Sequence, residues 1–233
     1  MKLKLLLLVL AACPIGLAQT SGTASSVSKP VVKPGVKEVQ VPFASLKPIA
    51  TFKVGSTADW LAVSDDAIWV TATEPNSVQR IDPATDRVVA KVILPEEACS
   101  DLAIGFGSLW VPLCGKNPSL VRIDAVTNKI TATLPVGPAD SEGGITVSGD
   151  SIWLVTDKNG TLSRIDPSTD TVRQKISIPS GSYNPLFGDG IIWITGFDSS
   201  VLTAVDAVTG ELLASSPVGP KPRFLTEEAQ FGR

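Results

Sequence analysis

Residues 151–178, "SIWLVTDKNGTLSRIDPSTDTVRQKISI", contain three short strand candidates separated by two turns, and "GITVS" (144–148) adds a fourth just before them. β-Branched residues dominate these segments, and no run approaches the length of a helix. Ile152 and Trp153 point to opposite faces of their strand because successive side chains alternate. A strand that is apolar on both faces predicts a sheet covered on both sides by neighbouring sheets.

A unit with these features, about 40 residues long, occurs four times in the chain. The tryptophan of the second strand recurs at intervals of 41, 43 and 40 residues, at Trp69, Trp110, Trp153 and Trp193. The turn motif "RIDPSTD" (164–170) recurs with nearly the same period, its aspartate standing at Asp82, Asp124, Asp166 and Asp206. Four-stranded antiparallel sheets that repeat and pack face to face indicate a β-propeller.

The repeated aspartate is predicted to be a turn residue rather than a catalytic one, because its carboxylate can accept hydrogen bonds from nearby backbone amides. The turn ends on a residue type that tolerates a left-handed backbone, namely Asp86, Asn128, Asp170 or Gly210. An arginine precedes the motif's aspartate in three units, at Arg80, Arg122 and Arg164. We expect the arginine stems to pack between blades and the heads to pair locally, with an anion-binding ring as the alternative.

The two ends of the repeat carry unpaired strands. "PIATFKVG" (48–55) resembles the fourth strand "ITATLPVG" (130–137), and a fifth unit, "PRFLTEEAQFGR" (222–233), stops before its tryptophan strand. One loose strand at each end would leave sheet edges and blade faces bare. We therefore expect an all-β fold, a β-propeller of four-stranded antiparallel blades. About four complete blades are expected, the chain being a C-terminally truncated fragment of a six- to eight-bladed ring.

The N-terminus is predicted to be a targeting segment. "MKLK" is cationic, "LLLLVLAA" is apolar, and Gly16 and Ala18 supply small residues for cleavage before Gln19, so residues 1–18 read as a signal peptide. In the alternative, a lipoprotein, the lipobox-like "LAAC" would leave a lipid on Cys13. A transmembrane segment is not expected, because about 14 apolar residues are present and a span needs roughly 20.

The predicted domain boundaries follow from composition. Residues 19–47 are rich in Ser, Thr, Pro and Lys and are expected to be a flexible leader. Residues 48–233 are expected to form the propeller. The chain is therefore predicted to be exported, to the periplasm or the extracellular space.

Cys99 and Cys114 flank "SDLAIGFGSLWVPL" (100–113), which predicts a hairpin turning about "FGS". Pairing Ile104 with Leu109 and continuing outward places the two cysteines opposite each other, at a separation that a disulfide can span. Disulfides persist in oxidising compartments, which agrees with export. We predict a Cys99–Cys114 disulfide.

Composition narrows the range of functions. The formal net charge is −3, so the chain lacks the basic footprint of a nucleic-acid-binding protein. The sequence contains no histidine, which removes the commonest general base and the commonest metal ligand. Catalytic residues are not predicted, and neither is a cofactor.

The motifs "IWV", "RIDPATDRVVAKV" (80–92) and "RIDPSTDTVRQKI" (164–176) resemble those of the YVTN-type propellers and of the wider streptogramin (virginiamycin B) lyase-like group. The resemblance covers residues 48–224 and implies a β-propeller. Such propellers include lyases, cell-surface proteins and binding modules. The lyases are understood to use a histidine base, acidic residues and a divalent metal, and no histidine is present here to take that role.

In a propeller, the loops between blades share one face with the loops that join strands two and three. Residues there that do not repeat are candidates for ligand binding, because the fold does not require them. They are Asp59, Trp60, Asp101, Glu142, Tyr183, Asn184 and Arg223, with Glu74, Lys116, Asp157, Lys158 and Asp198 on the neighbouring loops. Trp60 could stack on a sugar or another flat ligand. Alternatively, its ring plugs the channel or the gap to an absent blade.

Asp59, Asp101 and Glu142 come from three successive blades, and converging carboxylates could hold Mg²⁺ or Ca²⁺. The alternative for these residues is ordinary solvated loop charge. The leading hypothesis for function is a non-enzymatic scaffold whose channel-mouth loops bind a small molecule, a glycan or a protein. The second hypothesis is a metal-dependent lyase with its histidine in missing blades.

Overall fold

The computed structural model describes residues 41–226. The predicted signal peptide, Cys13 and most of the predicted leader lie outside these residues. The chain divides between Pro48 and Ile49. Residues 41–48 contain one short 3-10 helix, η1 (Phe43–Ser45). No helix of the described part is long and apolar enough to cross a bilayer.

The second part, from Ile49, contains sixteen strands in four sheets, each of which is one blade. Blade one comprises β1 (Ala58–Val63), β2 (Ile68–Ala72), β3 (Ser77–Asp82) and β4 (Arg87–Ile93), and blade two comprises β5 (Ala103–Gly105), β6 (Ser108–Leu113), β7 (Ser119–Asp124) and β8 (Ile130–Leu134). Blade three comprises β9 (Ile145–Val147), β10 (Ile152–Asp157), β11 (Thr161–Asp166) and β12 (Thr171–Ser177), and blade four comprises β13 (Ser182–Gly188), β14 (Ile191–Gly196), β15 (Val201–Asp206) and β16 (Leu212–Pro217).

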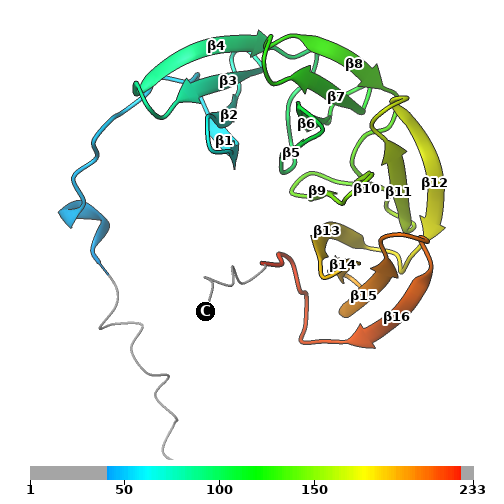
Figure 1. Ribbon diagram of the computed structural model, residues 1–233. Helices are drawn as coiled ribbons and strands as arrows, with labels where there is room; N and C mark the ends of the chain where they lie inside the picture. The colour runs from blue at the N-terminus through cyan, green and yellow to red at the C-terminus, as the bar shows by residue number, and fades with distance from the viewer. Residues whose placement is uncertain (1–40, 227–233) are drawn as a thin grey trace, which may run out of the picture. The chain divides into compact units, whose positions relative to one another are not determined.

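Within every blade, strands that are neighbours in sequence pair antiparallel in chain order. Figure 1 shows the four blades side by side in sequence, with the first strand of each innermost and the fourth outermost. The predicted all-β propeller, with four complete four-stranded blades, is confirmed.

Each pair of neighbouring blades encloses an apolar core that contains one tryptophan. Trp69 belongs to the core between blades one and two, Trp110 to that between two and three, and Trp153 to that between three and four. These three tryptophans are at most 1% exposed. Ile152, beside Trp153 in β10, lies in the preceding core, so the second strand is buried on both faces as predicted.

The repeated aspartates are turn residues. Asp82 accepts a hydrogen bond from the backbone N–H of Ala84 at 2.8 Å, and Asp124, Asp166 and Asp206 accept equivalent bonds in their own turns. The residue that ends each turn has a left-handed backbone, with φ of 51°, 57°, 54° and 74° at Asp86, Asn128, Asp170 and Gly210. Both parts of the turn prediction are confirmed.

The repeated arginines stack on the tryptophan of their own blade. The guanidinium carbon lies 5.6, 5.0 and 5.1 Å from the ring centroid in the pairs Arg80–Trp69, Arg122–Trp110 and Arg164–Trp153. This position suits a planar cation that retains polar contacts at its edge.

Two of the arginines also reach the next blade, a contact that the sequence analysis did not predict. Arg122 donates from Nη1 to the Pro167 carbonyl at 2.7 Å and to Asp170 Oδ1 at 2.9 Å. Arg164 donates from Nη1 to the Val208 carbonyl at 2.7 Å. These bonds attach one blade to the turn between the third and fourth strands of its neighbour.

The predicted disulfide between Cys99 and Cys114 is present, with a Cα–Cα distance of 5.7 Å. The pairing of Ile104 with Leu109 that led to this prediction is also present. The ladder shifts farther out, where Ala98 bridges Leu113. The bond ties the loop before β5 to the end of β6.

The prediction of a strand at residues 48–55 is wrong. Residues 49–57 are outside the strands, although Ser56 donates to the carbonyl of Thr73 at 3.1 Å. A strand requires a ladder of backbone hydrogen bonds, and this segment makes only isolated contacts with blade one.

The ion pairs of the arginines give a direct test of stability. Arg164 is 2% exposed, and its Nη2 donates to both oxygens of Asp150 at 2.9 and 3.0 Å. The Arg164 guanidinium holds the pKa of Asp150 at about 2, below its ordinary 3.8. We expect Asp150→Asn to lower the free energy of unfolding at pH 7 by about 1–2 kcal/mol, because a buried guanidinium loses its counter-charge while the carboxylate is partly screened by water.

The matched control is Asp66→Asn, since Asp66 is 76% exposed and its contacts are with the Ser64 hydroxyl and with the less buried Arg80. Asp66→Asn should lower the free energy of unfolding by less than Asp150→Asn does. The carboxylate of Asp150 stabilises the fold above pH 3.8, and this contribution disappears as the pH falls toward 2. Urea unfolding at pH 7 and pH 3 measures both effects. Equal losses for the two variants at pH 7 would contradict the assignment.

Candidate functional site

The loop that enters blade three, two parts of blade four and the segment after β16 meet at one end of the blades. This is the end at which the second strand of each blade finishes. Because strands alternate in direction, the loops between blades and those joining second to third strands lie at this end. Together they form a pocket of about 170 Å³, called here the loop-end pocket. It is lined by Asp140, Ser141, Glu142, Tyr183, Asn184, Phe197, Asp198 and Arg223.

An aromatic pair forms one wall of the loop-end pocket. Tyr183 is the second residue of β13 and Phe197 follows β14, and their ring centroids are 6.4 Å apart with an interplanar angle of 55°. The Tyr183 hydroxyl donates a hydrogen bond to Asp198 at 3.1 Å. Burial, and next this hydrogen bond, raise the pKa of Tyr183, so the phenol stays protonated and available as a donor at neutral pH.

Arg223 places a cation on the same wall. Its guanidinium carbon lies 4.9 Å from the Phe197 ring centroid, while the Lys221 ammonium lies 5.3 Å from the same ring. The backbone carbonyl of Arg223 accepts hydrogen bonds from Asn184 Nδ2 at 2.7 Å and from Thr195 Oγ1 at 2.6 Å. The backbone at Arg223 is thus fixed to blade four, whereas its side chain is exposed.

One polar atom at the pocket lacks a partner. Asn184 is 5% exposed, and its Oδ1 makes no hydrogen bond within the described residues. An unpaired acceptor that is buried carries a free-energy cost unless something satisfies it. The Asn184 Oδ1 is therefore an unsatisfied acceptor on a residue that lines the loop-end pocket.

The opposite wall comes from the loop that enters blade three. Asp140 forms an ion pair with Lys158 at 3.0 Å, and the hydrogen bond from this pair raises the pKa of Lys158. Glu142 has a left-handed backbone, with φ of 63°. Its N–H donates to the Cys99 carbonyl at 2.8 Å, so the disulfide-bonded loop of blade two supports this wall.

The structure thus brings four of the seven predicted residues, Glu142, Tyr183, Asn184 and Arg223, to one pocket. Asp59 and Trp60 lie in β1 of blade one, and Asp59 is exposed. The Trp60 ring packs against the core between blades one and two, and its indole N–H has no partner within the described residues. The ring thus packs between blades one and two, and both the stacking role and the plugging role of Trp60 stay predictions.

Asp101 is held in the loop before β5. Its carboxylate accepts the N–H of Leu102 at 2.8 Å, and its own N–H donates to the Gly143 carbonyl at 3.0 Å. Burial raises the pKa of Asp101, and the hydrogen bond from Leu102 opposes that effect.

The three carboxylates considered as metal ligands are not gathered in one place. Among residues 41–226, no group of three or more His, Cys, Asp or Glu side chains is arranged to hold a metal ion. Asp59, Asp101 and Glu142 therefore do not form a common site.

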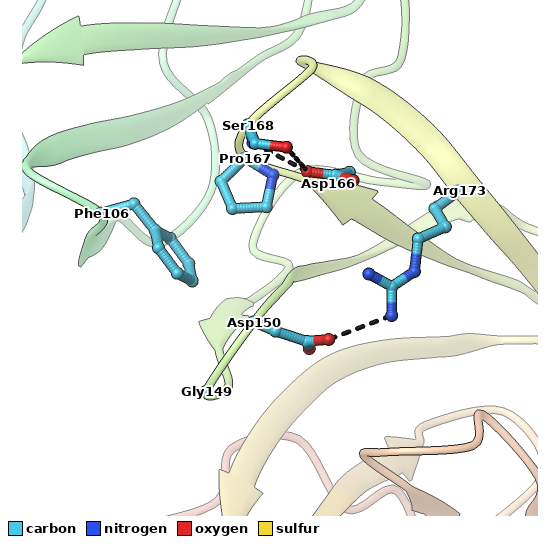
Figure 2. A pocket seen from close by; sticks show the side chains of 7 residues that line it. All are labelled: Phe106, Gly149, Asp150, Asp166, Pro167, Ser168 and Arg173. Atoms are coloured by element: carbon cyan, nitrogen blue, oxygen red, sulfur yellow. Dashed lines mark hydrogen bonds and ion pairs between the residues drawn. The ribbon is translucent and has the colours of Figure 1, made fainter.

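A larger pocket lies at the other end of the strands, where the hairpin turns are, and is called here the hairpin-end pocket. Its volume is about 500 Å³, and it is lined by Phe106, Gly149, Asp150, Asp166, Pro167, Ser168 and Arg173 (Figure 2). The sequence predicted only a hairpin turn about "FGS" here and did not predict this pocket. The available signal was an aromatic residue at a turn position that favours Asn, Asp or Gly.

Comparison with known proteins supports the fold. Neither a protein-family model nor a curated protein matches the chain. Among solved structures, the chain is similar to BamB from Moraxella catarrhalis, with a TM-score of 0.55 and 18% identity over 68% of this chain and 47% of that one. It is also similar to glutaminyl cyclase from Myxococcus xanthus, with a TM-score of 0.45 and 12% identity over 68% and 69% of the two chains.

The matched part thus spans about half the length of BamB. The similarity to BamB agrees with the propeller architecture. The resemblance to the YVTN-type and streptogramin lyase-like propellers stays a prediction.

The buried carboxylate of Asp101 gives a second prediction. Because burial raises its folded pKa, the stability of the protein falls as the pH rises from the ordinary pKa of 3.8 to that raised value. Asp101→Asn removes the buried charge and keeps an acceptor for the Leu102 N–H. We expect the variant to have a higher free energy of unfolding than the wild type at pH 7, measured by urea unfolding.

Asp59→Asn is the control, because Asp59 is an exposed carboxylate at the innermost strand of blade one. That change should leave the free energy of unfolding unaltered. A loss of stability in Asp101→Asn would show that the charge itself is needed by the loop.

Proposed function

We propose that this chain is an exported, non-enzymatic interaction scaffold that binds a partner protein through the loop-end pocket and the residues around it. The blades supply a rigid frame, and the loops at one end supply the contacts. The gathering of Tyr183, Phe197 and Arg223 at one exposed site carries the proposal.

The residue types favour a protein partner. Tyrosine and arginine are enriched among the residues that dominate binding energy at protein interfaces, and aromatic residues in general are common there. Arg223 lies over the Phe197 ring, and Tyr183 is oriented by Asp198. Side chains held in this way lose little conformational entropy when a partner binds.

The size of the pocket points in the same direction. At about 170 Å³, the loop-end pocket is smaller than the roughly 300–1,000 Å³ that is usual for small-molecule sites. It suits one inserted side chain of a partner whose other contacts lie on the surrounding loops. The buried Asn184 oxygen would accept a hydrogen bond from a donor at the tip of that side chain.

Export is supported by two features. The N-terminal sequence has the charged, apolar and small-residue segments of a signal peptide. The Cys99–Cys114 disulfide suits an oxidising compartment.

The binding proposal is tested with a phage-displayed random peptide library selected against the full chain. Peptides that bind the wild type should lose at least about tenfold in affinity on Tyr183→Ala or Arg223→Ala, as expected for residues that dominate an interface. Biolayer interferometry on the purified variants measures the affinity. Asn184→Leu, which removes the unpaired acceptor, should weaken peptides that insert a donor.

The control is Glu211→Ala, an exposed residue at the hairpin end of blade four, which should bind as the wild type does. Tyr183→Phe keeps the ring and should retain most of the affinity. If no peptide is enriched, or if enriched peptides bind all variants equally, the loop-end pocket is not the interaction site.

Export has its own test. Mass spectrometry of the mature protein from a bacterial host should find an N-terminus at Gln19, because Gly16 and Ala18 provide the small residues that signal peptidase requires. A lipid on Cys13 would replace the soluble form by the lipoprotein form and still place the protein outside the cytoplasm. An N-terminus that retains residues 1–18 would contradict export.

A further inference from the structure

The hairpin-end pocket lies between the turns of blades two and three. Phe106 comes from the turn between β5 and β6, Asp150 from the turn between β9 and β10, and Arg173 from β12. Its volume of about 500 Å³ falls within the range of small-ligand sites. It is built without any residue of the loop-end pocket, so an inference from it is independent of the proposed function.

Phe106 occupies a position that the fold would fill differently. Phe106 and Gly107 join the paired residues Gly105 and Ser108, with φ of 55° and 67°. A two-residue turn with both φ angles positive favours Asn, Asp or Gly at the first position. Blade four uses Asp189 and Gly190 at the same turn, with φ of 52° and 78°.

Phe106 is also exposed where burial would be expected of its type. The side chain is 39% exposed and belongs to none of the three inter-blade cores. A bulky residue with a left-handed backbone is strained, and an exposed aromatic ring gains little from packing. The turn conformation disfavours phenylalanine and the ring is only partly covered, so the exposed part of the ring is free to contact a ligand in the hairpin-end pocket.

The rest of the pocket combines an apolar wall with fixed polar groups. Figure 2 shows the Phe106 ring and the Pro167 ring on one side of the hollow, and the Asp150–Arg173 pair on the other. Asp150 is held by Arg164 as well as by Arg173, whose Nη2 donates to Asp150 Oδ2 at 3.0 Å. The other N–H groups of Arg173 have no hydrogen-bond partner within residues 41–226.

The charges around the pocket balance. Asp150 and Asp166 are opposed by Arg173 and by Arg164 behind Asp150. An anionic ligand would meet two carboxylates, and a cationic one would meet Arg173. A wholly apolar ligand would bury the free donors of Arg173 without partners.

We propose that the hairpin-end pocket binds a neutral carbohydrate, with the apolar face of one sugar ring on Phe106 and its hydroxyl groups on Asp150 and Arg173. A sugar ring presents C–H groups on one face and hydroxyl groups around its edge. These hydroxyl groups can donate to the carboxylate and accept from the guanidinium. The arrangement uses every feature of the pocket that the fold leaves unexplained.

The test uses the full chain with a panel of neutral tetrasaccharides, namely cellotetraose, maltotetraose, chitotetraose and mannotetraose, measured by isothermal titration calorimetry. At least one should bind the wild type. Phe106→Asn, which suits the turn better than phenylalanine does, should weaken that sugar at least tenfold and should also raise the unfolding temperature. Phe106→Tyr should retain binding.

Two further variants test whether the sugar binds at this site. The first is a control for the loop-end pocket, and the second removes a polar contact of the hairpin-end pocket. Arg223→Ala should bind the sugar as the wild type does. Arg173→Met keeps the side-chain length, removes the donors and should weaken the sugar. Absence of binding by all four sugars, equal binding by Phe106→Asn, or binding of a pentaproline peptide in place of sugars would each overturn the proposal. A lower unfolding temperature in Phe106→Asn would overturn it as well, because Phe106 would then serve the fold.

Discussion

The structure depends on a second strand that must be covered on both faces. In β10, Trp153 packs into the core with blade four, whereas Ile152 packs into the core with blade two. Because side chains alternate along a strand, no single partner sheet can bury both. A blade buries both faces of its second strand only between two neighbours, as blades two and three do, and a propeller supplies a neighbour on each side. The ends of the blades contribute little to these apolar cores, so the sequences of the loops and turns there can vary.

Polar contacts reinforce the apolar cores unequally along the series. Arg122 and Arg164 attach to the turn of the following blade, where they find a carbonyl or a carboxylate. Arg80 pairs within blade one, and its Nε has no partner in the described residues. The corresponding turn residue, Asn128, also has an unpaired Oδ1. Within residues 41–226, Arg80 and Asn128 thus do not form the link between blades that Arg122 and Arg164 form farther along, and the apolar core is the main contact between blades one and two. The disulfide orders the adjoining loop of blade two.

Sequence periodicity predicted the features that every unit shares, because repeated positions have repeated surroundings. It therefore gave the blades, the turn aspartates and, through hairpin register, the Cys99–Cys114 bond. Only some of the predicted binding residues lie together, because a blade contacts only its neighbours and residues from more distant blades do not meet. Tyr183 and Arg223 line one pocket because the segment after β16 returns to blade four, whereas Asp59 lies in blade one and Glu142 in the loop that enters blade three. Side-chain packing, as in the burial of the Trp60 ring, follows from three-dimensional contacts that no spacing specifies.

Left-handed backbone at non-glycine residues distinguishes what the fold requires from what it tolerates. Asp86, Asn128 and Asp170 adopt it at one repeated turn, where their short polar side chains keep the strain small. Several residues adopt it outside that series. Glu142 and Phe106 are two of them and line a pocket at either end of the strands, whereas Glu74, Ser200 and Lys221 line neither pocket. Stability alone would favour Gly, Asn or Asp at the positions of Glu142 and Phe106. The rigid blades can hold these two residues in unfavourable conformations because the inter-blade cores, which lie elsewhere, already fix the backbone on which they stand.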